Sequence, residues 1–143
     1  MLLIRLFYLS LAIGILSGVG LHPLSAQKLM APNLLVKGYF EDGKLLGANR
    51  LVLGYLEDGL IKTPNKKLIG AIKGDRILAP NHRLLARFKN DRLEMPNHRL
   101  ILYVREDRLL GPNRKVLLYF KGVRPRDAAL CYFFFEEALG SFR

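Results

Sequence analysis

The stretch LVLGYLEDGLI, residues 51–61, contains the pattern that decides the fold. Val52, Gly54 and Leu56 recur at every second place, which is the period of a β-strand with one buried face. Asp58-Gly59 follows, a dipeptide typical of two-residue hairpin turns because both residues tolerate positive φ. Ile61 is again apolar and follows the turn. The stretch therefore predicts a β-hairpin with one long and one short arm.

The same pattern recurs along the chain with a period of sixteen residues. An asparagine marks each copy, at Asn33, Asn49, Asn65, Asn81, Asn97 and Asn113. Proline precedes it except in the second copy, where Ala48 does. Proline presets φ for the first central position of a turn and asparagine suits the second, so this pair predicts a second turn. Numbered from the proline, the repeats are 32–47, 48–63, 64–79, 80–95, 96–111 and a partial 112–127.

The repeat separates apolar from charged positions. Positions five, seven, nine and fourteen carry no charge in the five full repeats, whereas positions four, ten and thirteen mostly do. A two-residue turn at positions eleven and twelve pairs nine with fourteen, eight with fifteen and seven with sixteen. A slip by one residue would bring charges into the core. Each long strand must pair with two neighbours, so we expect it to bend near position seven, where glycine suits a bend in three repeats.

The segments VKGYFEDGKLL, LVLGYLEDGLI and LIGAIKGDRIL resemble the repeats of the five-fold β-flower proteins, which are small exported bacterial proteins of unknown function. The resemblance covers about residues 29–123. It implies an all-β fold in which 16-residue β-hairpin repeats form a five-petalled, closed meander. Five tight turns match this arrangement, at 42–43, 58–59, 74–75, 90–91 and 106–107, and Glu106-Asp107 fits the turn chemistry least well. The resemblance implies export but no activity.

The two ends of the chain differ from the repeats. Residues 1–26 combine a basic start, the apolar run Leu6 to Leu21 and a short polar segment, which predicts a signal peptide cleaved before Gln27; a retained anchor is the alternative. Residues 27–143 then form a single domain. The apolar tail AALCYFFFEEALGSFR, residues 128–143, is expected to cap the repeat core, mostly as a strand.

Residues for catalysis or metal binding are sparse. Thr63, Ser141 and Cys131 are the nucleophile candidates after residue 26, and no motif places a base beside them. Cys131 lies in an apolar run and is expected to be a buried, inert thiol. His82 and His98 share position three and are expected to be solvated turn residues. We therefore predict neither an enzyme, nor a metal site, nor a cofactor.

Charge gives the strongest functional hypothesis. The net charge is +11, and the positive excess lies in the later repeats, because repeats 32–47 and 48–63 are neutral. Arginine beside aromatic rings can bind phosphates or sugar acids. The candidate polyanion-binding residues are Arg83, Lys89, Arg92, Arg99, Arg105, Arg108, Tyr103 and Tyr119. The alternative is a charged outer face that prevents edge-to-edge association.

These observations predict an exported domain, periplasmic, outer-membrane-associated or extracellular, with a structural or interaction role at the bacterial envelope. The alternative function is a polyanion-binding module for acidic glycan, lipopolysaccharide or nucleic acid, with anionic glycan or lipid head groups as the partners. The sequence pattern identifies neither the partner nor the oligomeric state.

Overall fold

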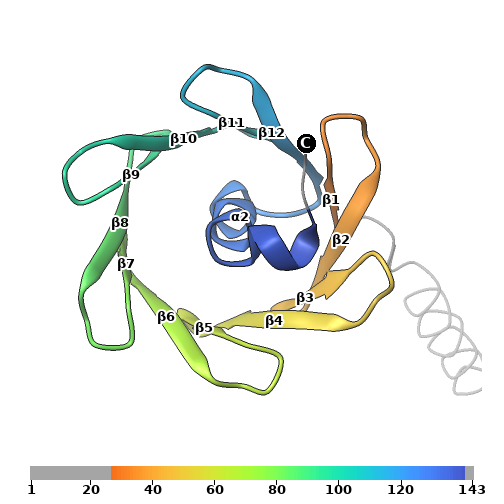
Figure 1. Ribbon diagram of the computed structural model, residues 1–143, viewed down its shortest axis with the longest axis horizontal. Helices are drawn as coiled ribbons and strands as arrows, with labels where there is room; N and C mark the ends of the chain where they lie inside the picture. Colours follow the sequence, from red (N-terminus) through yellow and green to blue (C-terminus); the bar gives the residue numbers. More distant parts are fainter. Residues whose placement is uncertain (1–26, 141–143) are drawn as a thin grey trace, which may run out of the picture.

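Residues 27–140 form a closed ring of antiparallel strands around a C-terminal helix in the computed structural model (Figure 1). The predicted signal peptide lies outside these described residues. The strands are β1 (Lys28–Met30), β2 (Val36–Glu41), β3 (Lys44–Gly47), β4 (Val52–Glu57), β5 (Leu60–Lys62), β6 (Leu68–Lys73), β7 (Arg76–Leu78), β8 (Leu84–Lys89), β9 (Arg92–Glu94), β10 (Leu100–Val104), β11 (Arg108–Leu110) and β12 (Val116–Lys121). The helix is α2 (Pro125–Leu139).

Each Pro-Asn or Ala-Asn turn points outward and joins a short strand to a long one, forming what we call a petal (Figure 1). Petals 1 to 6 are β1–β2, β3–β4, β5–β6, β7–β8, β9–β10 and β11–β12. The expected closed meander is confirmed, but it has six petals where we expected five, because five tight turns join six outward hairpins. The five tight turns predicted from the sequence connect successive petals. The sixth junction closes the ring because β1 pairs with β12, placing Leu29 opposite Phe120. The partial last repeat is thus completed by the start of the domain.

The predicted register is confirmed in the tight hairpins. Position nine pairs with position fourteen in each of the five, for example Leu56 with Ile61. Asp58 and Gly59 both have positive φ, as a type I′ turn requires. The turn at 106–107 closes with a hydrogen bond from the Arg105 N–H to the Arg108 carbonyl at 2.9 Å, and neither of its central residues has positive φ. This turn therefore differs in backbone conformation from the Asp-Gly turns, as its sequence suggested.

The outward turns contain a feature that the sequence reading missed. Asparagine occupies the second central position as predicted, but the left-handed residue is the one after it: Leu34, Arg50, Lys66, His82, His98 and Arg114 have φ between 64° and 68°. In five of the six turns the asparagine Oδ1 accepts the backbone N–H two residues on, as from Arg99 to Asn97 at 3.0 Å, whereas in the third turn Thr63 Oγ1 accepts the Lys67 N–H. The turn is therefore a three-residue hairpin loop held by an Asn side chain.

A β-bulge at position six bends each long strand. Leu45 pairs with Gly54 and Leu46 with Val52, so Leu53 is the extra residue, and the same shift recurs in the other petals. The prediction that position five is buried is wrong. The bulge instead turns position six toward the core, where Leu53, Ile69 and Leu85 pack.

The tail is a helix, so the expectation of a strand is wrong. Pro125 occupies its first turn, Arg124 donates to Asp127 at 2.8 Å, and Gly140 with φ 84° ends it. The ring surrounds the helix (Figure 1), and its side chains from Ala128 to Phe135 lie in the core or pack against it. The prediction that the tail packs on the repeat core is confirmed, since Ala128, Ala129, Leu130 and Cys131 are buried in the same core as the strands.

Position seven shapes the interior for this helix. A Cβ added at Gly54 would lie 2.3 Å from Cζ of Phe135, and one at Gly70 would lie 2.5 Å from Cζ of Phe134. In the later repeats Ala86, Leu102 and Leu118 fill the same position and are fully buried. Gly54 and Gly70 therefore leave room for aromatic rings, and the bend that we expected glycine to serve also occurs in the three petals that lack glycine at position seven.

Candidate functional site

The candidate arginines and lysines fall into two groups: those that pair with a carboxylate of the chain and those that do not. Arg105 forms an ion pair with Asp91, and Arg108 donates from Nε and Nη2 to both carboxylate oxygens of Asp107 at 2.8 and 3.1 Å. The Arg108 guanidinium holds the pKa of Asp107 below its usual value, and Asp107 raises the pKa of Arg108. These two arginines already have anionic partners within the chain.

The rings of the two predicted tyrosines already contact arginine side chains of the chain itself. The Tyr103 ring lies under two guanidinium groups, with the Arg105 and Arg114 Cζ atoms 5.2 and 5.0 Å from its centroid. Arg108 lies 5.3 Å from the Tyr119 centroid. These cation–π contacts anchor the outer wall of the ring. They leave the aromatic faces less available to a ligand than the sequence reading assumed.

Arg83, Lys89, Arg92 and Arg99 are different. All four are exposed, and none forms an ion pair or a side-chain hydrogen bond with another part of residues 27–140. Arg83 and Arg99 stand beside the outward turns of petals 4 and 5. Lys89 and Arg92 stand directly opposite each other across the tight turn between β8 and β9.

This cross-strand pair belongs to a series around the ring. Positions ten and thirteen face each other in every tight hairpin, and Glu41 opposite Lys44 is a pair of opposite charges. The next hairpin pairs Glu57 with Leu60. In the two hairpins after it the pair becomes Lys73 opposite Arg76 and then Lys89 opposite Arg92. Like charges directly opposite each other destabilise a sheet unless a counter-charge lies between them. Within the described residues, no carboxylate forms an ion pair with either of these two pairs.

A basic hollow of about 520 Å³ lies beside them on the outer wall. Arg76, Arg87, Lys89 and His98 line it, and its single carboxylate, Asp75, is bonded to Arg126. Arg76 and Arg87 are themselves cross-strand partners. The Nε of Arg87 is buried without a hydrogen-bond partner. The hollow therefore combines three fixed positive charges with an unused donor.

Glu94 of β9 is buried, with 5 % of its surface exposed. It is the register partner of Arg87, as the sequence predicted, yet the two side chains form no ion pair. Its Oε2 has no hydrogen-bond partner and lies 3.9 Å from Nδ1 of His98. His98 is exposed as predicted, with 68 % of its side chain accessible and the Glu94 carboxylate nearby, and His82 is also exposed at its turn.

We call Lys73, Arg76, Arg87, Lys89 and Arg92 the basic wall. The sequence reading named Lys89 and Arg92 but missed the other three. The signal was present, because pairing position nine with fourteen necessarily pairs ten with thirteen.

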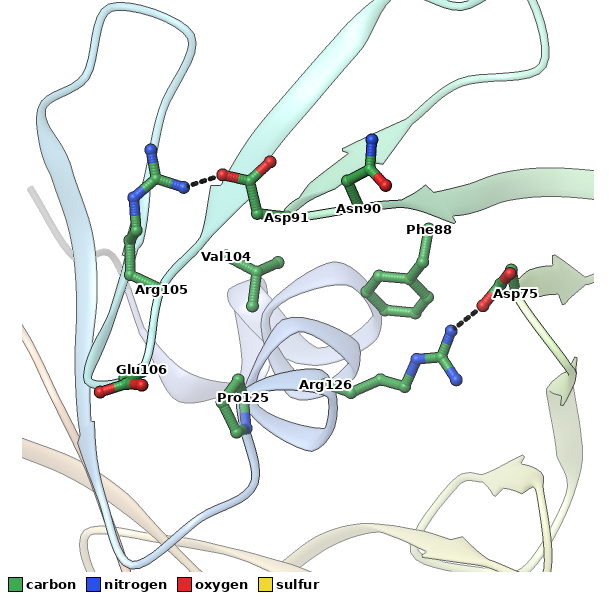
Figure 2. Close-up of a pocket in the computed structure, with 9 residues that line it drawn as sticks. All are labelled: Asp75, Phe88, Asn90, Asp91, Val104, Arg105, Glu106, Pro125 and Arg126. Carbon is green, nitrogen blue, oxygen red and sulfur yellow. Dashed lines mark hydrogen bonds and ion pairs between the residues drawn. The ribbon is translucent and has the colours of Figure 1, made fainter.

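A second hollow, of about 560 Å³, lies at the tight-turn end of the ring beside the start of α2 (Figure 2). Phe88, Val104 and Pro125 supply apolar surface, and the Arg126 guanidinium lies 4.5 Å from the Phe88 ring centroid. Figure 2 shows Arg126 bonded to Asp75 and Arg105 bonded to Asp91. Because Arg126 and Arg105 already have carboxylate partners there, we interpret this hollow as part of the packing contact between the helix and the ring.

The remaining reactive groups lie apart. Cys131 is buried, and burial raises the pKa of its thiol. Thr63 Oγ1 donates to Asn65 and accepts the Lys67 N–H at 3.1 Å, so it serves its turn. The described residues contain no cluster of three or more metal-ligating side chains. Nor is any helix of residues 27–140 long and apolar enough to span a bilayer.

Comparison with known proteins gives one match. A family model described as "5-fold beta-flower protein" matches residues 26–136, which include all twelve strands and most of α2. No curated protein and no solved structure matched this chain in the same comparison.

Proposed function

The chain belongs to the 5-fold beta-flower family, and from that membership and the geometry of the basic wall we propose that it is an exported module of the bacterial envelope that binds anionic polymers. The family description names no activity, so the proposal rests on the surface. The proposed role is binding rather than catalysis. The ligand class is a chain of carboxylate, sulfate or phosphate groups.

One observation carries this proposal: Lys89 and Arg92 stand directly opposite each other without a carboxylate partner. Their repulsion opposes folding in the free protein, and an anion placed between them removes it. Lys73 and Arg76 repeat the arrangement one repeat earlier. Equivalent positions in neighbouring repeats are two strands apart, or about 10 Å. A linear polyanion can contact both pairs, whereas one small anion cannot.

Protection of a sheet edge does not account for these charges. Lysine and arginine commonly blunt an exposed edge strand. Here every described strand is paired on both sides, because β1 joins β12 and closes the ring. The ring has no open edge for the basic wall to protect. This closure weakens the alternative explanation for the charge and favours a ligand.

The test is salt-dependent retention on immobilised heparin. Arg76→Gln/Lys89→Gln/Arg92→Gln removes three cations from the basic wall. The matched control Arg50→Gln/Lys66→Gln/Arg114→Gln removes the same charge from residues that lie over Tyr39, Tyr55 and Tyr103. We expect the wall variant to elute at clearly lower salt than the control. Equal shifts would show that only net charge matters, and an unchanged wall variant would refute the proposal.

Export has its own test. Mass spectrometry of the protein isolated from producing cells should give Gln27 as the first residue. Recovery in the cytoplasmic fraction with Met1 intact would contradict the proposed envelope location.

A further inference from the structure

Three leucines at the tips of neighbouring petals are the most exposed large apolar residues described. Leu34 and Leu35 on petal 1 are 62 % and 58 % exposed, and Leu51 on petal 2 is 66 % exposed. The equivalent positions of petals 3 to 6 carry only lysine, arginine or histidine. Apolar tips are therefore confined to one edge of the ring, that of β1 to β4 (Figure 1).

Leu34 also adopts an unfavourable backbone conformation. Its φ is 68°, in the left-handed region that leucine disfavours. Arg50, Lys66 and Arg114 occupy the same turn position, and their charged groups lie over the rings of Tyr39, Tyr55 and Tyr103. That packing explains why long side chains replace glycine there. Leu34 is mostly in solvent, so no comparable contact accounts for it.

Cations flank the leucines on both sides. Petal 6 precedes petal 1 around the ring and carries Arg114 and Lys115, and petal 3 follows petal 2 and carries Lys66 and Lys67. Between petals 1 and 2, Leu35 also lines a hollow of about 470 Å³, together with Leu53 and Leu139 and the polar side chains of Lys37 and Asn49. The edge thus has an apolar centre and basic flanks.

We propose that this edge contacts a lipid bilayer that contains anionic lipids. Leu34, Leu35 and Leu51 enter the interface between head groups and acyl chains, while the flanking cations meet lipid phosphates. Apolar side chains bracketed by cations fit this partner better than a wholly anionic one. The basic wall lies on β6 to β9, on the other side of the ring (Figure 1), and stays free for a polymer. The proposal does not depend on polymer binding.

Fluorescent probes at equivalent positions of petals 2 and 4 test whether this edge contacts the bilayer. Leu51 and Arg83 share position four, and Cys131, the single cysteine, is buried. The full chain is isolated from producing cells as Leu51→Cys or Arg83→Cys, labelled with an environment-sensitive fluorophore and mixed with phosphatidylglycerol–phosphatidylcholine vesicles. Brominated acyl chains should quench the probe at position 51 and not the one at 83. Equal quenching, or none at 51, would overturn the proposal.

Affinity gives a second measurement. Leu34→Asn suits the left-handed turn position, so Leu34→Asn/Leu51→Gln should fold and bind these vesicles about tenfold more weakly for each leucine removed. The control His82→Asn/Leu60→Gln makes similar changes on other petals and should bind normally. Unchanged binding by the leucine variant would overturn the proposal. So would a wild-type dimer that ignores vesicles and becomes monomeric in this variant, because the edge would then bind a second copy.

Discussion

Gly54 of β4 and Phe135 of α2 are complementary across the interior of the ring: a Cβ on Gly54 would come within 2.3 Å of Cζ of the phenylalanine ring. The two residues come from different parts of the chain, one from a repeat and one from the tail. Their contact shows that the ring and the helix form one core. The helix also reaches the first strand of the basic wall, because the Phe134 ring lies against Gly70 of β6.

Gly54→Ala should destabilise the protein by about 1–3 kcal/mol, because the added methyl group meets both Phe135 and, at 2.9 Å, the Lys62 carbonyl. Urea denaturation measures the loss. Gly54→Ala/Phe135→Leu should lose less than the sum of the single changes. Additive losses would mean that the two residues are not in contact.

Replacing the left-handed residue of an outward turn should have different effects on stability in two petals. His82→Gly removes an unfavourable conformation and should stabilise the protein by up to about 1 kcal/mol. Arg114→Gly also loses the contact with Tyr103, which is worth about 0.5–1 kcal/mol, and should gain little or nothing. Thermal unfolding of both variants checks the difference, and equal stabilisation would contradict the role of the stacked pair.

The turns and the strand register were predictable because the sixteen-residue repeat specifies them locally. The helix was not. An apolar run such as that from Ala128 to Phe135 has no clear period, and its three phenylalanines favour strands by propensity. Only the closed ring, which surrounds the tail, makes a helix with apolar sides all round the better structure.

The sequence predicted which side chains of the candidate site are exposed, but not which of them form ion pairs. The exposure of Lys89 and Arg92 follows from their positions in the repeat. The neutralisation of Arg105 by Asp91 joins residues from successive tight turns, and the repeat pattern does not show which neighbouring turns come together. Cations that recur at one position of a repeat therefore suggest more unpaired charges than the folded protein has.

Asp91→Asn/Asp107→Asn should strengthen retention on heparin, because it leaves Arg105 and Arg108 without their carboxylate partners. Asp42→Asn/Asp58→Asn changes the net charge equally at two other tight turns, where Asn also accepts positive φ. The first variant should elute at higher salt than this control. Identical elution would show that the local pairing of the two arginines does not matter.

The buried thiol predicts a pH dependence. Burial raises the pKa of Cys131 in the folded protein, so its contribution to stability is complete below the ordinary thiol pKa of about 8.5 and is lost as the pH rises above it. The free energy of unfolding of wild type, measured relative to Cys131→Ala, should fall above about pH 9 by up to about 1.4 kcal/mol per pH unit. A flat difference up to pH 10 would mean that the thiol is not buried.

The proposed polymer site is tested most directly by amide chemical shifts in ¹⁵N-labelled protein titrated with a sulfated oligosaccharide. The largest changes should fall on Lys73, Arg76, Lys89 and Arg92 and the strands that carry them, β6 to β9, while the Glu41–Lys44 hairpin should change little. Changes spread evenly over all six petals, or centred on the hairpin that contains Glu41 and Lys44, would contradict the assignment of the basic wall.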